Sequence, residues 1–301
     1  MLQRLAVKKR LINKNKSNMK KILSTLMAMA VVVLTTTACA ERITPSKKYV
    51  TKTVKVDKFD AISTSSSVDV VYTQISGSQK VEIYAPDNLI DYIYARVENG
   101  TLKVGFKTPY NNFSINGRHV KEVRVSAPAV SSLRASSSGD IILKNGLKTS
   151  GSVQLKSSSS GDIKGDIVSC DELVASASSS GDVVLEKVKC ETLKASASSS
   201  GDVSIKNVSA TDVDASASSS GDVFLAGTCR NATYRSSSSG DLKAKELKAV
   251  DVYASASSSG DVSCYVSGTL TAKTSSSGEV AYKGNPKHVE HSQKRGLRKI
   301  D

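Results

Sequence analysis

The sequence predicts an all-β fold, a single-stranded parallel β-helix (β-solenoid) with about 20 residues per coil and SSSGD corners. The nine letters ASASSSGDV occur at Ala175–Val183, Ala195–Val203, Ala215–Val223 and Ala254–Val262. Gly–acid pairs follow serine runs eight times, at steps of 18 to 22 residues. Repeats of this period are typical of solenoids, whereas a propeller blade needs about 40–50 residues.

Within each unit the apolar residues alternate with polar ones. Leu193, Ala195 and Ala197 occupy every second position, and Val203 and Ile205 do so after the corner. A period of two indicates strands with one buried face, whereas a helix needs spacings of three and four. A unit of strands and turns this short cannot bury its apolar face alone, so we expect coils to stack at about 4.8 Å around one core.

The SSSGD phrase is interpreted as the corner of each coil. We expect glycine to supply a backbone conformation with positive φ, serines to stack in register, and the acid to accept hydrogen bonds that fix the turn. The predicted structural corner residues are Gly139, Asp140, Gly161, Asp162, Gly181, Asp182, Gly201, Asp202, Gly221, Asp222, Gly240, Asp241, Gly260, Asp261, Gly278 and Glu279.

Carboxylates stacked one coil apart repel each other by about 1 kcal/mol in solvent-like surroundings. Serine and backbone donors, lysines or bound cations must offset this repulsion. Calcium needs six to eight oxygen ligands, and each corner offers one acid, so we expect no metal and no cofactor. The acids form an even column instead of a cluster, and the histidines (His119, His288 and His291) are scattered, so we expect no catalytic residues.

Two cysteines occupy equivalent places in consecutive units. Cys170 and Cys190 each lie nine residues after their corner glycine, and Cys229 falls in the same column. Cys170 and Cys190 therefore predict either a disulfide, in an oxidising compartment, or a pair of stacked thiols. Cys264 lies elsewhere in its unit, and no Cys/His spacing typical of zinc occurs.

The N-terminus has the pattern of an export signal. We predict a signal peptide over residues 1–38, with 1–18 as an upstream mis-start because Met19-Lys20-Lys21 opens the basic region. The stretch LTTTAC, ending at Cys39, resembles a relaxed lipobox of bacterial lipoproteins. We therefore expect lipidation of Cys39, which anchors the protein to a membrane without spanning it.

The net charge of +14 lies mostly at the two ends of the chain. Residues 39–282 hold 28 basic and 26 acidic side chains, a balance of +2. A nucleic-acid-binding domain keeps a basic face, so we expect no nucleic-acid partner.

We divide the mature chain into four parts. Residues 39–55 are a lipidated tether, 56–130 a strand-rich N-terminal part of the solenoid, 131–286 the regular repeats, and 287–301 a basic C-terminal cap or tail. The stretch STSSSVDVVYTQ at Ser63–Gln74 looks like an early corner, with Val68 in place of glycine.

Several stretches together resemble one known family. They are the SSSGD corners, VDKFDAIS (Val56–Ser63), APDNLIDYI (Ala85–Ile93), VENGTLKV (Val97–Val104) and YKGNPKHV (Tyr282–Val289). As a set they are similar to the putative auto-transporter adhesin head GIN domain, formerly a domain of unknown function, found in exported proteins of Bacteroidetes-type bacteria. The resemblance implies a β-solenoid with a surface or adhesion role, and it transfers no catalytic residues.

These observations predict a non-catalytic lipoprotein of the cell envelope, anchored in the outer membrane and exposed at the surface. Its partners would be the membrane, through the lipid, and an unidentified protein or glycan bound by an adhesin or surface binding protein. Two alternatives stay open: a periplasmic structural or scaffold protein, and a polysaccharide-binding or polysaccharide-cleaving β-helix protein. The ligand and the oligomeric state are not predicted.

Overall fold

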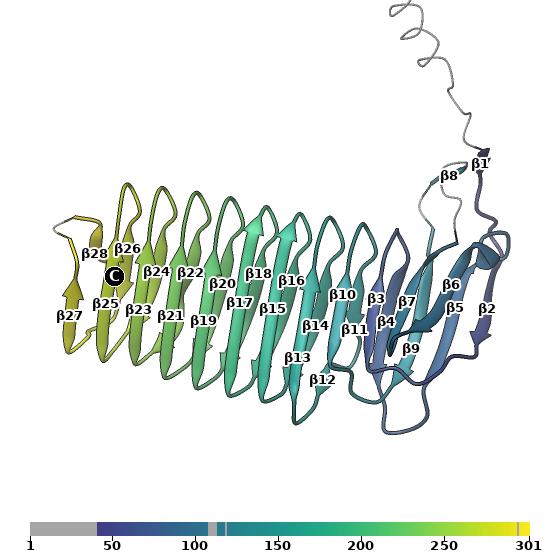
Figure 1. The fold of residues 1–301 in the computed structure, drawn as a ribbon, viewed down its shortest axis with the longest axis horizontal. Coiled ribbons are helices and arrows are strands. Elements are labelled where there is room, and N and C mark those ends of the chain that lie inside the picture. Colours follow the sequence, from purple (N-terminus) through teal and green to yellow (C-terminus); the bar gives the residue numbers. More distant parts are fainter. Residues whose placement is uncertain (1–40, 108–112, 118, 294) are drawn as a thin grey trace, which may run out of the picture. The chain divides into compact units, whose positions relative to one another are not determined.

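The structure, a computed structural model, describes residues 41–107, 113–117, 119–293 and 295–301. Its regular elements in these ranges are strands, apart from one 3-10 turn, η1 (Ile90–Tyr92). Parallel coils of about 20 residues are stacked along one axis, which confirms the predicted all-β solenoid (Figure 1). The predicted signal peptide (1–38), its mis-start (1–18) and the lipidation residue Cys39 lie outside the described residues.

The chain divides into two units by its contacts. In the smaller one, β1 (Glu41–Ile43) and β8 (Phe113–Ile115) form a two-stranded parallel sheet. The Asn116 N–H continues the pairing by donating to the Ile43 carbonyl (3.1 Å). The larger unit, 44–108 and 117–301, holds the coils.

Each coil of the repeats contributes one strand to each of two sheets, called sheet 1 and sheet 2. In spatial order, sheet 1 contains β27 (His288–His291), β25 (Thr269–Thr274), β23 (Asp251–Ala256), β21 (Asn231–Ser236), β19 (Asp212–Ala217), β17 (Thr192–Ser199), β15 (Glu172–Ser179), β13 (Ser152–Ser157), β10 (Ser132–Ala135), β3 (Ala61–Thr64), β7 (Thr101–Phe106) and β6 (Ile93–Glu98).

Sheet 2 faces it across the core. In spatial order it contains β2 (Tyr49–Val54), β5 (Lys80–Pro86), β9 (Glu122–Ala127), β4 (Asp69–Gln74), β11 (Ile141–Leu143), β14 (Ile163–Ser169) with β12 (Leu147–Lys148) also beside it, β16 (Val183–Lys189), β18 (Val203–Ser209), β20 (Val223–Thr228), β22 (Leu242–Ala249), β24 (Val262–Val266), β26 (Val280–Lys283) and β28 (Leu297–Lys299).

The strands of the repeats pair in parallel, with equivalent positions in register except for shifts within β18–β20, β20–β22 and β22–β24. Leu173 of β15 pairs with Leu193 of β17, and Val183 of β16 pairs with Val203 of β18. These residues alternate with partly exposed ones and have no exposed surface themselves. Burial of each such side chain contributes about 1.5–3 kcal/mol, so inward columns drive the stacking.

The N-terminal end has a different construction. The first coil, β3 and β4, stacks directly on β10 and β11, although these strands are about 71 residues apart in sequence. On the other side of this coil, β7 and β9 pair in parallel with β3 and β4. The outer strands β6, β5 and β2 then pair antiparallel, which ends the run of parallel coils.

The C-terminal end continues the regular pattern. Val289 of β27 pairs with Leu270, and Leu297 of β28 pairs with Val280, both in parallel. Residues of the basic segment 287–301 thus form a last coil in both sheets.

Candidate functional site

The SSSGD segments form tight turns that join sheet 1 to sheet 2. In each, the glycine N–H donates to the carbonyl of the first serine, as between Gly201 and Ser198 (3.2 Å). The positive φ that we expected at glycine instead belongs to the middle serine, at 56° to 68°. These serines are Ser66, Ser137, Ser159, Ser179, Ser199, Ser219, Ser238, Ser258 and Ser276. A positive φ at the second turn residue matches a type II′ turn.

The corner glycines are needed for close approach between coils. A Cβ built on Gly201 would lie 2.7 Å from both the Gly181 carbonyl oxygen and the Ser178 nitrogen of the preceding coil. These are backbone atoms that cannot move aside. Our expectation about glycine was therefore wrong in its reason: stacking excludes the side chain, while the left-handed conformation falls on serine.

The acids of the corners form a hydrogen-bonded ladder. In seven steps the backbone N–H of one acid donates to the Oδ1 of the Asp in the preceding coil. The N···Oδ1 distances are 2.8–3.0 Å for the pairs Asp140–Asp69, Asp162–Asp140, Asp182–Asp162, Asp202–Asp182, Asp222–Asp202, Asp241–Asp222 and Glu279–Asp261. Backbone donors thus offset the repulsion between stacked carboxylates.

Lysines neutralise parts of this ladder. Lys164 pairs with Asp162 (2.8 Å), and Lys243 pairs with Asp222. Hydrogen bonding to these carboxylates raises the pKa of both lysines. At Asp182, burial raises the pKa of the carboxyl, and the neighbouring Asp162 and Asp202 add to the effect. The ladder is a structural feature that carries residual repulsion at its centre.

The described residues contain no group of three or more His, Cys, Asp or Glu side chains arranged to hold a metal ion. The three histidines occupy separate places. His119 Nδ1 lies 3.0 Å from the Gly117 carbonyl oxygen, and His291 Nε2 lies 3.1 Å from the Thr274 hydroxyl. His288 belongs to the last strand of sheet 1 and is exposed. The structure therefore brings none of the corner acids together with a histidine.

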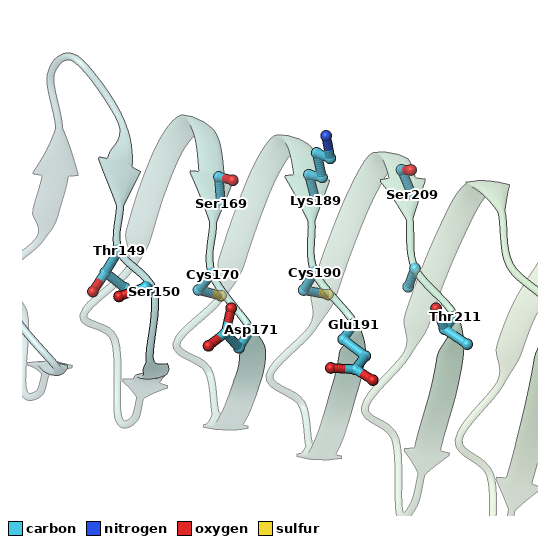
Figure 2. Close-up of a pocket in the computed structure, with 11 residues that line it drawn as sticks. Thr149, Ser150, Ser169, Cys170, Asp171, Lys189, Cys190, Glu191, Ser209 and Thr211 are labelled. Carbon is cyan, nitrogen blue, oxygen red and sulfur yellow. The ribbon is translucent and has the colours of Figure 1, made fainter.

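Each coil has a second turn at the opposite edge from its corner. Along this edge, the second turns of four successive coils border one hollow of about 530 Å³. Residues 149–150, 169–171, 189–191 and 209–211 of four successive coils line it (Figure 2). Cys170 and Cys190 occupy equivalent positions in this lining (Figure 2). The register places Ala210, and then Cys229, next in the same column.

The four described cysteines are free thiols. Burial, together with Asp171 and Glu172, raises the pKa of Cys170 to about 11. Burial and the neighbouring Cys170 raise the pKa of Cys190 to about 12. Such thiols stay protonated near neutral pH and are poor nucleophiles, so this hollow does not have the electrostatics of a cysteine-based active site.

Two tyrosine features were not predicted from the sequence. Tyr234 is fully buried and its hydroxyl has no hydrogen-bond partner. On the outer surface at the N-terminal end, Tyr49 stacks on Tyr84 (5.2 Å between ring centroids) and the Arg124 guanidinium lies 4.0 Å from the Tyr84 ring centroid. The abundance of tyrosine in the N-terminal third was visible in the sequence, but the pairing of residues 35 positions apart was not.

The comparison with protein families identifies the chain. The family model described as putative auto-transporter adhesin, head GIN domain, matches residues 58–187 and 176–286. The chain belongs to this family. The match spans most of both sheets of the solenoid, including the corner ladder, so the resemblance read from the sequence is confirmed for the head GIN domain.

Solved structures share the fold. A putative adhesin from Parabacteroides merdae is 19% identical, with a TM-score of 0.61 over 87% of this chain and 100% of that one. A putative lipid binding protein from Parabacteroides distasonis is 23% identical, with a TM-score of 0.57 over 87% and 100%. A putative adhesin from the same species is 16% identical, with a TM-score of 0.57 over 86% and 100%.

A search of the curated proteins gives no significant match. Within the ranges that the structure describes, no helix has the length and apolar character needed to cross a membrane.

Proposed function

We propose that this head GIN domain protein is a non-catalytic lipoprotein of the cell envelope whose solenoid acts as a surface adhesin. The family match over residues 58–286 carries the proposal, since the family is described as the head of an adhesin. The sequence supports export, with a signal pattern over 1–38 and Cys39 as the lipidated residue. The lipid would anchor the chain in the outer membrane.

The chemistry of the rod is consistent with binding instead of catalysis. The Oδ1 atoms of the corner Asp residues accept hydrogen bonds from the backbone of the next coil, as Asp182 does from the Asp202 N–H (3.0 Å). Catalysis on a carboxylate needs that group positioned against a substrate with a matched pKa. A regular ladder stabilises the scaffold and leaves the outer faces of both sheets for a protein or glycan partner.

Protease shaving of intact cells, with lysed cells as control, tests the surface assignment. We expect the protein to disappear from intact cells, as detected by blotting. Survival until lysis would overturn the adhesin proposal and favour a periplasmic scaffold. The Cys39→Ala variant tests the anchor separately: it should lose incorporated fatty acid and leave the membrane fraction.

Cell attachment tests the adhesin role itself. Deletion of the protein should reduce binding of the bacteria to host epithelial cells or to immobilised glycans, and the wild-type chain should restore it. The Cys39→Ala chain should not restore attachment, because it is released from the surface. Unchanged attachment after deletion would contradict the proposal.

A further inference from the structure

We propose that Cys170 and Cys190 become a disulfide that links two consecutive coils in the middle of the rod. The inference goes beyond the adhesin proposal and depends only on export of the chain to a compartment where disulfides persist. It rests on register, on the surroundings of the two sulfurs and on the separation of the other cysteines.

The register brings the two backbones to a bridging distance. Ser169 pairs with Lys189 before the turn, and Glu172 pairs with Thr192 after it. Two residues lie between these pairs in each coil, so the cysteines are stacked one coil apart. That spacing is about 4.8 Å, within the Cα separation of about 4.4–6.8 Å found in disulfides. The Cys170 N–H also donates to the Lys189 carbonyl (3.1 Å), which holds this register.

The side chains converge on one peptide group. The Cys170 thiol donates to the Glu172 carbonyl (3.3 Å), and the Leu173 N–H is a hydrogen-bond neighbour of the Cys190 sulfur. The Cys190 sulfur therefore lies near backbone of the coil that contains Cys170, and the two cysteine side chains point in the same direction (Figure 2). Figure 2 shows the two cysteine side chains side by side in the lining of the hollow.

The other described cysteines have no adjacent thiol. Ala210 lies between Cys190 and Cys229 in the column. Cys264 is fully buried within β24, in register with Ala244 and Tyr282. Cys170 and Cys190 are thus the two described cysteines that the register places on adjacent coils.

The oxidant is a disulfide carried by a thiol–disulfide exchange partner in the exported compartment. Each cysteine loses one proton and together they lose two electrons; the sulfur–sulfur bond forms, and the partner's disulfide is reduced to two thiols. Exchange needs a thiolate, and burial in the folded coils raises the pKa of both thiols, so the exchange takes place while the chain folds, before these thiols are buried. The product is neutral, so its burial carries no charge penalty.

The disulfide would limit the spread of unfolding along the solenoid. In a solenoid each coil contacts its neighbours, and unfolding spreads from coil to coil. A covalent bond between the coils of β14–β15 and β16–β17 closes a loop of the chain and stops that spread.

Peptide mapping tests the bond directly. The full-length protein from the envelope is treated with N-ethylmaleimide, unfolded and digested with trypsin without reductant. Cleavage after lysine and arginine puts the four cysteines in different peptides: 165–187, 190–194, 207–230 and 249–273. We expect 165–187 linked to 190–194, with the link lost on reduction. Alkylation of both peptides, or a link from either to another peptide or another chain, would overturn the proposal.

A matched pair of variants tests the effect on stability. The urea midpoint of the wild-type protein should fall on reduction, and that of Cys190→Ser should be the same with and without reductant. Cys229→Ser removes a thiol from the same column and should respond to reductant as the wild type does. A wild-type urea midpoint that does not change on reduction, although the bond is present, would contradict the stabilising role of the disulfide.

The disulfide and adhesin proposals can fail separately. If protease shaving places the protein in the periplasm, the adhesin proposal is wrong and the disulfide proposal still stands.

Discussion

The same corner is built in two ways at the two regions of the solenoid. At the first coil the position after the serines is Val68, which is fully buried. In the next coil it is Gly139, where a Cβ would approach the Val68 carbonyl and the Thr64 hydroxyl. Below Val68 lies strand β9 of the N-terminal cap, and above it begins the stack of SSSGD turns. Glycine is therefore required at a corner that stacks on the turn of another coil, whereas the first corner, which stacks on β9, accommodates valine.

The largest expected loss of stability comes from adding a side chain at a corner glycine. Gly201→Ala should destabilise the protein by about 3 kcal/mol, because its Cβ meets backbone of the preceding coil. Gly151→Ala is the control: nothing lies within 4 Å of its Cβ, and the loss of unfolded-state freedom should make it neutral or slightly stabilising. Urea unfolding measures both. Equal effects would refute the close-approach explanation.

As the pH rises, the repeats should lose stability before the first coil does. In the reduced protein, burial raises the pKa of Cys229 from 9.0 to about 12. The neutral thiol is favoured in the folded state, so its contribution is complete below pH 9 and lost as pH rises toward 12. Between pH 8.5 and 10.5 this loss amounts to about 2 kcal/mol.

The Cys229→Ala variant should lack that part of the pH dependence, as urea unfolding at the two pH values would show. In the first coil, burial raises the pKa of Tyr72 from 10.0 to about 12, so its contribution is lost only above pH 10. A Cys229→Ala chain with the full wild-type slope would be inconsistent with a protonated thiol in the folded state.

Two buried tyrosines should respond oppositely to removal of the hydroxyl. Tyr72, in the first coil, donates to the Pro128 carbonyl (2.7 Å), so Tyr72→Phe should cost about 1.5 kcal/mol. Tyr234, in the repeats, has no partner for its hydroxyl, so Tyr234→Phe should stabilise by about 1 kcal/mol. Thermal unfolding of the two variants decides this. Destabilisation by Tyr234→Phe would indicate a partner for that hydroxyl.

The smallest effect probes the acid ladder. Asp182→Asn keeps an oxygen that can accept the Asp202 N–H and removes repulsion from Asp162 and Asp202. It should stabilise by about 0.3 kcal/mol, less at high salt. Asp182→Ala loses the acceptor and should destabilise by about 1 kcal/mol. If both variants lose stability equally, charge instead of hydrogen bonding maintains the ladder.

Much of the fold follows from local signals. The alternation of Leu193, Ala195 and Ala197 predicts their burial, and the spacing of the Gly–acid pairs predicts the parallel coils. The role of the middle serine could not be predicted, because φ depends on which residues the neighbouring coils press against. The hydroxyl partners of Tyr72 and Tyr234 are likewise set by residues distant in sequence.

By itself, the sequence determined the coil length, the parallel stacking of the coils and the columns of inward-facing side chains, because the pattern for each lies within one 20-residue unit and is repeated. The tertiary structure alone decided that Ser63–Gln74 joins the stack beneath residues 132–143, since the intervening cap hides that contact from any local pattern. It also decided that backbone N–H groups bridge the acids from Asp69 to Asp241 and from Asp261 to Glu279, because this depends on which backbone groups meet between coils.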